Sequence, residues 1–334
     1  MDNNKETKIK DMEKEFDRAK RKKSSYDCLI PLSGGKDSIY ALYLCDKIYD
    51  MKVLGITFDN GFLSEHARNN ISEAVRRTNA DHIYYGVNPK EMMKLYNLFI
   101  KNIGAFCPPC MRGIEIVTKM GVQIYDIPLI VKGSGKRTSY LSYIPELFQD
   151  GNPTFFQNVI KDEDVHVEAM GEFKRTFNLK RFVHLSTNVL GIYDPTYPQF
   201  VSIFDYIDTP EDEMVDVIRN EMKWKRPEDR TEHMDCLASN IASYIHSRKV
   251  KGFSDKTAKN SSLIRLGSLD RSEAMKYESE YANNVTEPDN LDWFLKRINM
   301  NKEDFFRYIG DWKRVERYRP KDTGFNRLLN ILRG

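Results

Sequence analysis

A six-residue run at positions 33–38, Ser-Gly-Gly-Lys-Asp-Ser, combines the residue types that bind a phosphate group. Its two glycines lack a Cβ atom, so the backbone can approach an anion closely. A helix that begins inside the run directs its first N–H groups and the positive end of its dipole at that anion. Ser33 and Ser38 add hydroxyl donors, and Lys36 adds a mobile positive charge. The run therefore predicts a loop that binds the phosphates of a nucleotide.

Asp37, in the same run, carries a negative charge that repels a phosphate unless a cation lies between them. Carboxylates are usual ligands of Mg²⁺, which also binds phosphate oxygens. The spacing differs from the Walker-type loop, which is longer and ends in a Lys-Ser or Lys-Thr pair. A plain glycine-rich turn between a strand and a helix is the alternative, and the complete hexapeptide disfavours it. We therefore expect Lys36 and Asp37 to be catalytic residues that act on a nucleotide with bound Mg²⁺.

Apolar segments of strand length alternate with helical patterns around this run. Strands are predicted at 26–32, 52–58, 82–87 and 127–132, and helices at 64–78, 89–103 and 111–120. The alternation predicts right-handed βαβ units, and hence an α/β fold with a parallel, doubly wound sheet. Ligands of such sheets bind beyond the carboxyl ends of the strands, where the strand order reverses. Three further loops lie after or near such ends, at 59–61, 107–110 and 133–137. We expect all four loops to form one site.

The sequence pattern changes twice along the chain, which divides it into three predicted parts. Residues 1–24 are expected to form a charged helix facing solvent, residues 25–140 the nucleotide-binding domain, and residues 141–334 a substrate-binding and mainly helical C-terminal region. Within the last part, residues 150–200 follow neither a helical nor a strand periodicity. Helical patterns return after residue 211.

The composition disfavours several classes of protein. With 52 Lys and Arg against 49 Asp and Glu, the 334-residue chain carries a net charge of only +3. Strong nucleic-acid binders usually have more basic, clustered surfaces, so we expect a small-molecule acceptor rather than tRNA. No apolar run approaches the roughly 18 residues that span a bilayer, and the charged N-terminus lacks the apolar stretch of a secretory signal. A cytoplasmic protein with no membrane contact is therefore expected.

Three of the five cysteines have a spacing that suggests chemistry. Cys28 and Cys45 fall in apolar patterns and are predicted core residues. Cys107 and Cys110 are separated by two prolines, which stiffen the turn and place both thiols within reach of one metal ion or one disulfide. A position near a helix N-terminus and near Arg112 should lower the pKa of both thiols, which favours metal binding and nucleophilic attack.

A pair of cysteines supplies only two metal ligands, so a metal site needs a third residue, and Cys236 is the candidate. A buried core position for Cys236 is the first alternative. A catalytic persulfide or disulfide pair at Cys107 and Cys110, without any metal, is the second. Zinc completed by His233 is the third. The remaining histidines are expected to be structural or exposed.

The run at 33–38 resembles the PP-loop of the N-type ATP pyrophosphatase superfamily, also called adenine nucleotide α-hydrolases. The resemblance covers roughly residues 25–140 and implies about five parallel strands, bound ATP and Mg²⁺, and AMP and pyrophosphate as products. It also implies that the PP-loop grips the pyrophosphate, that the strand end at 57–59 meets the adenosine, and that the glycine loop at 133–135 flanks the nucleotide. The nucleotide-binding residues implied in this way are Ser33, Gly34, Gly35, Lys36, Asp37, Ser38, Thr57, Asp59 and Gly133.

A longer likeness is with the N-acetyl sugar amidotransferases of bacterial surface-glycan synthesis, which belong to this superfamily. It rests on YDCLIPLSGGKDSIYAL at 26–42, GITFDNGF at 55–62, NADHIYYGVNPK at 79–90 and the Cys-Pro-Pro-Cys turn, and it continues weakly at 259–274. The N-terminal cysteine-rich zinc ribbon of that family is missing here. The likeness implies that an N-acetyl group becomes an amidine, with ammonia from a glutaminase partner.

The cysteine pattern is similar to that of the tRNA 2-thiocytidine type of thiolase. There, three cysteines hold a 4Fe–4S cluster whose fourth iron is free to carry sulfide. By this resemblance Cys107, Cys110 and Cys236 are metal ligands, and Cys107 and Cys110 are also catalytic.

These patterns lead to a first functional hypothesis: ATP-dependent adenylation of a carbonyl or amide oxygen, followed by sulfur insertion with a sulfur-donor protein as partner. The alternative is nitrogen transfer with ammonia from a glutaminase subunit. A nucleotide sensor without turnover is a third hypothesis, which the complete PP-loop disfavours. The acceptor (a sugar, a nucleobase or a natural-product amide) and the oligomeric state, with a homodimer as one option, are left open.

Overall fold

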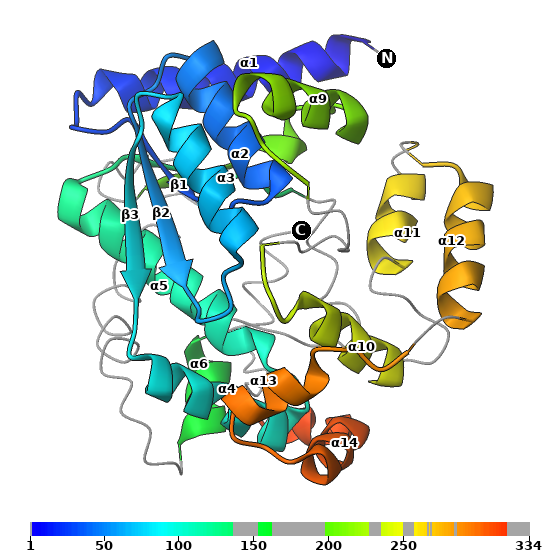
Figure 1. The fold of residues 1–334 in the computed structure, drawn as a ribbon. Helices are drawn as coiled ribbons and strands as arrows, with labels where there is room; N and C mark the ends of the chain where they lie inside the picture. Colours follow the sequence, from blue (N-terminus) through cyan, green and yellow to red (C-terminus); the bar gives the residue numbers. More distant parts are fainter. Residues whose placement is uncertain are drawn as a thin grey trace, which may run out of the picture.

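The sheet at the centre of the molecule has five parallel strands in the order β3-β2-β1-β4-β5 (Figure 1). This computed structural model describes residues 2–135, 153–161, 198–226, 235–249, 257–265, 267, 269–283 and 286–318. The strands are β1 (Cys28–Pro31), β2 (Val53–Asp59), β3 (Asp81–Gly86), β4 (Leu129–Lys132) and β5 (Gln199–Ser202). The predicted α/β class, the parallel sheet and its first four strands are confirmed. Strand β5 lies in a stretch that showed no periodicity.

The chain builds the sheet outward from β1 in two directions. It passes from β1 to β2 and β3 on one side, and then places β4 and β5 on the other. Cys28 pairs with both Val53 of β2 and Leu129 of β4, so β1 is the central strand. The strand order therefore reverses between β1 and β4, and the loops that follow these two strands lie at one edge.

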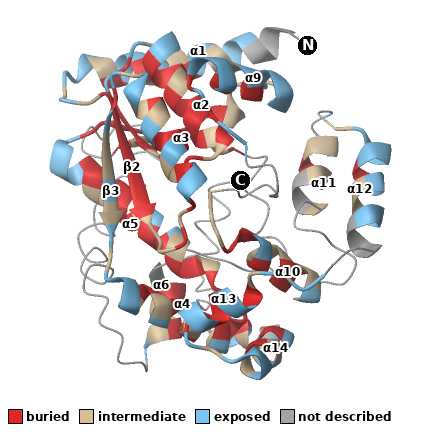
Figure 2. Cartoon of the chain, viewed as in Figure 1, coloured by how far each residue is buried: buried red, intermediate tan, exposed pale blue. Residues whose placement is uncertain are grey.

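Helices cover both faces of the sheet, and each face has its own apolar core. Along β1, Cys28 and Ile30 belong to one core and Leu29 to the other, because side chains alternate across a strand. Figure 2 shows β2 almost entirely buried and the edge strand β3 only partly buried. The first core is covered by α1 (Asp2–Arg21), α2 (Lys36–Tyr43), α3 (Glu65–Arg76) and α9 (Glu211–Glu221). The second is covered by α4 (Pro89–Ile103), α5 (Cys107–Tyr125) and α6 (Pro153–Ile160). Cys28 and Cys45 are fully buried, as predicted.

Helix α1 differs from the solvent-facing helix that its charge predicted. Met12, Phe16 and Ala19 are 0%, 2% and 4% exposed and belong to the first core. Their spacing of four and three residues puts them on one stripe of the helix. Through this stripe α1 packs against β4 and β5, so the N-terminal helix is part of the cover of the sheet.

The C-terminal helices add mainly to the second core. They are α10 (Ser239–Lys249), α11 (Thr257–Arg265), α12 (Arg271–Asn283), α13 (Leu291–Arg297) and α14 (Lys302–Gly310). Asn97 of α4 donates to the carbonyl oxygens of Ile298 and Asn299, both at 2.9 Å, and Phe294 and Phe305 are fully buried. Helices α11 and α12 lie against each other, apart from the sheet (Figure 1). In the described part of the chain, a π-helical turn and two 3₁₀ turns complete the elements: Leu44–Ile48, Ile203–Asp205 and Trp312–Arg317.

The described part of the chain contains no helix that is both long and apolar enough to cross a membrane.

Candidate active site

Two serine side chains hold the phosphate loop at 33–38 in shape. The Ser33 hydroxyl accepts a hydrogen bond from the Gly35 N–H at 3.2 Å. The Ser38 hydroxyl accepts one from the Ser33 N–H at 3.2 Å and donates to the Gly35 carbonyl at 3.0 Å. Ser38 therefore uses its one proton inside the loop. The first backbone hydrogen bond of α2 joins the Ile39 N–H to the Gly35 carbonyl, which places the positive end of the helix dipole at the loop.

Gly34 joins the phosphate loop to helix α3. Its φ is +80°, and a Cβ atom on it would lie 2.5 Å from the carbonyl oxygen of Ala67, so another residue would strain this contact. The Gly34 carbonyl accepts hydrogen bonds from Trp224 Nε1 at 3.0 Å and from Asn70 Nδ2 at 3.3 Å. Asn70 also binds Lys225 twice, accepting from its N–H at 2.9 Å and donating to its carbonyl at 3.0 Å. Contacts with α3 and with the segment around Trp224 therefore hold the loop in place at Gly34.

The loop after β4 touches the phosphate loop at Gly133. A Cβ atom on Gly133 would lie 2.3 Å from the carbonyl oxygen of Asp37 and 2.8 Å from the backbone nitrogen of Ser38. Only glycine fits at this distance from another backbone. The two glycine loops therefore meet where the strand order reverses, as predicted, and their use in nucleotide binding stays a prediction.

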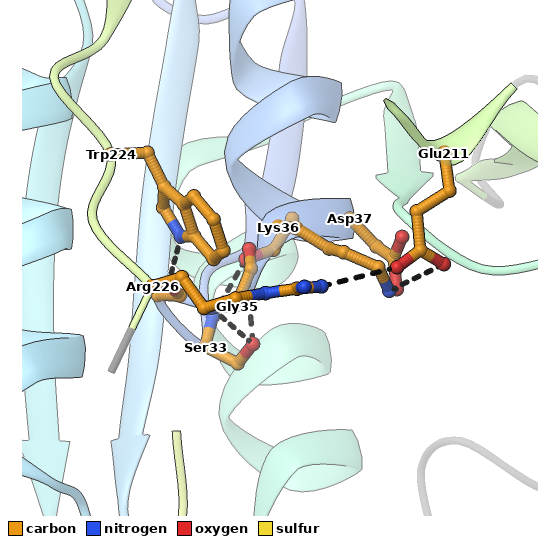
Figure 3. Close-up of polar contacts among 9 residues, drawn as sticks. Ser33, Gly35, Lys36, Asp37, Glu211, Trp224 and Arg226 are labelled. Atoms are coloured by element: carbon orange, nitrogen blue, oxygen red, sulfur yellow. Dashed lines mark hydrogen bonds and ion pairs between the residues drawn. The ribbon is translucent and has the colours of Figure 1, made fainter. Parts of the chain in front are cut away.

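Charged side chains from three segments meet beside the loop (Figure 3). Lys36 is only 8% exposed, and its Nζ lies 3.2 Å from Asp37 Oδ2 and 3.8 Å from Glu211 Oε2. Glu211 begins α9 and also lies 3.3 Å from the guanidinium of Arg226. Lys36 and Asp37, the two loop residues predicted to be catalytic, thus share an ion-pair network with Glu211 and Arg226, which the sequence did not indicate.

This arrangement fits a nucleotide phosphate with bound Mg²⁺. The two glycines of the loop leave its backbone open to an anion, and Lys36 supplies a positive charge next to it. The Asp37 side chain is 36% exposed, so its oxygens can reach a cation that also binds phosphate.

Thr57 and Asp59, the residues predicted to meet the adenosine, have different surroundings. Thr57 is 2% exposed, and its hydroxyl donates to the Leu32 carbonyl at 2.6 Å. It therefore accepts from His82 Nε2, 2.8 Å away, and burial lowers the pKa of His82 to about 4. The Thr57 hydroxyl thus links the end of β1 with β2 and β3 and uses its one proton there. Asp59, at the strand end, binds Arg68 at 2.7 Å. The contact of Thr57 and Asp59 with the adenosine stays a prediction.

The three cysteines of the predicted metal site come from distant parts of the chain and lie near one another. Cys107 and Cys110 begin α5, and Cys236 forms an isolated antiparallel bridge with Leu63, just after β2. Burial, and after it negative charge on Cys110 and Cys107, raises the pKa of Cys236, so the three thiols act on one another electrostatically. Asn60, in the loop after β2, donates from Nδ2 to Cys110 Sγ at 3.1 Å. All three thiols are partly buried against the second core.

The prediction that these thiols have lowered pKa values is wrong. Burial raises the pKa of Cys107 to about 12 and the pKa of Cys110 to about 11. The desolvation of a thiolate outweighs the helix N-terminus, and Arg112 binds Glu115 at 2.7 Å instead of a thiol. The positive charge of Lys249 lowers the pKa of Cys107, but less than burial raises it. Burial also lowers the pKa of Lys249 itself to about 8. The thiols are therefore protonated at neutral pH.

The predicted metal centre does not fit these cysteines as they are arranged. Among the residues that the structure describes, no three His, Cys, Asp or Glu side chains form a group that could hold a metal ion. His233 lies outside the described residues. The chemistry proposed for this site therefore uses neither an iron–sulfur cluster nor zinc.

Asp235 connects the thiols with the phosphate loop, and no sequence pattern indicated it. Its carbonyl accepts from the Ser64 N–H at 2.9 Å, and its Oδ1 lies 3.9 Å from the Cβ position of Gly35. Its negative charge raises the pKa of both Cys110 and Cys236. The segment that carries Cys236 therefore reaches the phosphate loop as well.

The C-terminal part of the chain matches a known family. Residues 228–332 match the family described as "LPS biosynthesis protein WbpG-like, C-terminal domain". The chain thus carries a WbpG-like C-terminal region, which contains Cys236 and helices α10 to α14. Lipopolysaccharide is a bacterial surface glycan, so the match agrees with the resemblance to enzymes of surface-glycan synthesis. A comparison with curated proteins gives no match.

Two solved structures are similar to the chain at low identity. The structure of NMN synthetase from Francisella tularensis is 10% identical, with a TM-score of 0.43, and the alignment covers 85% of this chain and 98% of that one. The U34-tRNA thiolase NcsA from Methanococcus maripaludis, with its 4Fe–4S cluster, is 15% identical, with a TM-score of 0.36 and coverage of 86% and 83%. At these scores the likeness says nothing about substrate or cofactor.

Proposed function

We propose that the protein is a PP-loop ATP pyrophosphatase that adenylates an amide oxygen and then transfers nitrogen to the amide carbon. The observation that carries this proposal is the contact of Gly133 with Asp37 and Ser38, where the strand order reverses. This contact brings both glycine loops to the edge at which parallel α/β sheets bind ligands. The buried Lys36 and the exposed carboxylate of Asp37 supply the charges that a nucleotide phosphate and its Mg²⁺ need.

The WbpG-like region favours nitrogen over sulfur as the transferred group. It belongs to a family named for lipopolysaccharide biosynthesis, and the sequence resembles the N-acetyl sugar amidotransferases of surface-glycan synthesis. The region also reaches the nucleotide site, since Asp235 Oδ1 lies 3.9 Å from the Cβ position of Gly35. The proposed acceptor is therefore the N-acetyl group of a sugar, a small molecule and not tRNA.

The proposed reaction has two steps. The amide oxygen of the acceptor attacks the α-phosphorus of ATP, and pyrophosphate leaves. Ammonia then attacks the amide carbon, AMP leaves with the former amide oxygen, and the nitrogen releases a proton to water. Adenylation is needed because an amide oxygen is a poor leaving group, whereas a phosphate ester of it leaves readily. The product is an amidine.

The residues of the loop stabilise the charge that develops in the first step. Lys36 and the N-terminus of α2 face the negative charge that grows on the leaving pyrophosphate. Bound Mg²⁺, held by Asp37 and phosphate oxygens, would supply further neutralisation. Ammonia requires a source, and we expect a glutaminase subunit as the partner.

Sulfur insertion is the second candidate, because Cys107 and Cys110 are near enough to Cys236 for their charge to act on it, and Asp235, next to Cys236, reaches the phosphate loop. A donor protein would have to place a persulfide on one of these cysteines. Its terminal sulfur would displace AMP from the carbon, and a second thiol would then attack the protein sulfur, forming a disulfide and releasing the thioamide.

Isotope labelling tests the proposal and separates the two candidates. The full chain is incubated with ATP, Mg²⁺, ammonium chloride and a panel of N-acetylated hexosamines that carry ¹⁸O in the amide. We expect ¹⁸O in the phosphate of AMP and an amidine among the sugars, both seen by mass spectrometry. If a thioamide forms with a persulfide donor and no amidine forms with ammonium, the transferred group is sulfur and not nitrogen. AMP that contains no ¹⁸O would contradict adenylation of the acceptor.

A further inference from the structure

Two cations from different segments meet on one carboxylate beside the phosphate loop. Lys36 Nζ lies 3.8 Å from Glu211 Oε2, and an Nη atom of Arg226 lies 3.3 Å from Glu211 Oε1. In Figure 3, Arg226 points from the Trp224 side of the loop toward Glu211. Glu211 thus makes the contacts with an Arg and a Lys that a phosphate group bound beside a glycine loop would make.

The backbone beside Arg226 is tied to the phosphate loop. Trp224 Nε1 donates to the Gly34 carbonyl at 3.0 Å. Lys225, the next residue, exchanges two hydrogen bonds with Asn70, which itself donates to Gly34. The anchoring side chains are buried, with Trp224 2% and Asn70 6% exposed. The position from which the Arg226 side chain extends is therefore fixed relative to the loop, as a ligand-binding residue requires.

The contact between Arg226 and Glu211 is of a kind that a phosphate can replace. Both side chains are about half exposed, at 51% and 49%, and exposed ion pairs contribute little to stability. A guanidinium binds a phosphate through two parallel hydrogen bonds, which is a stronger interaction. The charges also allow the exchange: Lys36 and Arg226 balance Asp37 and Glu211, and when Glu211 turns away, one positive charge is left for the incoming anion.

We propose that Arg226 is a further phosphate-binding residue of this site and that Glu211 occupies its guanidinium until the phosphate arrives. The inference rests on the proposed use of ATP and extends it to residues far from the 33–38 run. Because that run is expected to grip the pyrophosphate part of ATP, Arg226 is assigned to the same part and not to the AMP part.

Calorimetric binding of inorganic pyrophosphate with Mg²⁺, and separately of AMP, to the full chain tests this assignment. The Arg226→Ala variant is expected to bind pyrophosphate roughly ten- to a hundredfold more weakly than the wild type, with AMP binding changed less than about twofold. Arg226→Lys should restore only part of the affinity, because an ammonium lacks the fork of a guanidinium. Glu211→Gln should strengthen pyrophosphate binding severalfold, because it removes the competing charge.

Arg219→Ala is the matched control, because Arg219 lies on the same helix as Glu211 and forms an exposed pair with Asp216 at 3.3 Å. It should bind pyrophosphate as the wild type does. Wild-type pyrophosphate affinity in Arg226→Ala, or equal losses for pyrophosphate and AMP, would overturn the assignment. If Arg226→Ala loses pyrophosphate affinity but the labelling experiment yields AMP without ¹⁸O, the proposed function fails and Arg226 still binds phosphate. If the wild-type protein does not bind pyrophosphate, both the assignment of Arg226 and the proposed function are overturned.

Discussion

The phosphate loop and the three thiols lie at one edge of the sheet, in opposite surroundings. In the loop, charges are paired where an anion is to bind: Lys36 lies between Asp37 and Glu211. At the thiols, apolar packing dominates, and burial raises the pKa of Cys107 to about 12 and that of Cys110 to about 11. The loop thus holds charged side chains where the proposed nucleotide phosphate would bind, whereas Cys107 and Cys110 are held in the protonated form, which is a poor nucleophile.

This difference bears on the choice between nitrogen and sulfur. Sulfur chemistry at Cys107 or Cys110 requires a thiolate, and the surroundings make a thiolate costly. Nitrogen transfer requires nothing of these cysteines beyond packing, so it agrees with both regions as they are. The predictions below test the contrast, beginning with the largest expected effect.

Asp37→Asn should almost abolish pyrophosphate release, because the amide is a poor ligand for the cation that shields the phosphates. We expect a loss of roughly a hundred- to a thousandfold, the size seen when a charge-stabilising group is removed from an active site. The measurement is the rate of pyrophosphate release with an acceptor that the wild type uses. Asp216→Asn, on the exposed side of α9, is the control and should keep the wild-type rate. Retained activity in Asp37→Asn would remove this carboxylate from the mechanism.

Cys110 should react with iodoacetamide about a hundredfold more slowly at pH 8 than an exposed cysteine. Only the thiolate reacts, and a pKa raised from 9.0 to about 11 lowers the thiolate fraction about a hundredfold. The rate should rise with pH up to about 11. Asn60→Asp keeps the acceptor for the Phe62 N–H but replaces the donor to Cys110 with a charge, so the profile should move to higher pH. Fast alkylation at pH 8 would show that Cys110 is a reactive thiol and would favour sulfur insertion over nitrogen transfer.

Gly34→Ala should destabilise the protein more than Gly267→Ala. Both glycines have positive φ, +80° and +70°, but a Cβ on Gly34 would lie 2.5 Å from the Ala67 carbonyl, whereas one on Gly267 meets nothing within 4 Å. Gly267→Ala should therefore cost only about 1–2 kcal/mol of the free energy of unfolding, and Gly34→Ala at least about 2 kcal/mol more. Urea titrations of both variants give the comparison. Equal losses would mean that the loop does not depend on its contact with α3.

Thr57→Val should lower the free energy of unfolding by about 1–3 kcal/mol and leave ATP binding within about twofold of the wild type. The cost arises because the Leu32 carbonyl and His82 each lose a buried hydrogen bond. Thermal unfolding and ATP titration of the same sample measure both quantities. A large loss of ATP affinity with unchanged stability would instead support the predicted contact between Thr57 and the adenosine.

The sequence predicted those parts of the site that have a local signature. The six residues at 33–38, Gly133 and the Cys-Pro-Pro-Cys turn are short patterns next to recognisable strands, and the structure brings them to one edge. Strand β5 was not predicted from the sequence. It has only four residues, and its aromatic residue Phe200 is 44% exposed, so no continuous apolar run marks it.

The remaining residues of the site could not be found from local patterns. Trp224 binds a loop 190 residues earlier in the chain, and Glu211, which pairs with Arg226, contacts Lys36 of the same distant loop. The thiol pKa values were misjudged for a related reason: the helix N-terminus is a local feature, whereas burial of Cys107 and Cys110 arises when α5 packs into the second core.

The most direct test of the central claim is the identity of the phosphorus products of ATP. ³¹P NMR of the full chain with ATP, Mg²⁺, ammonium and an N-acetylated sugar should show AMP and pyrophosphate appearing at equal rates, and neither without the sugar. The same spectra of the Asp37→Asn variant should show unchanged ATP. Accumulation of ADP and orthophosphate would contradict cleavage between the α and β phosphates, and with it the assignment of this loop as a PP-loop.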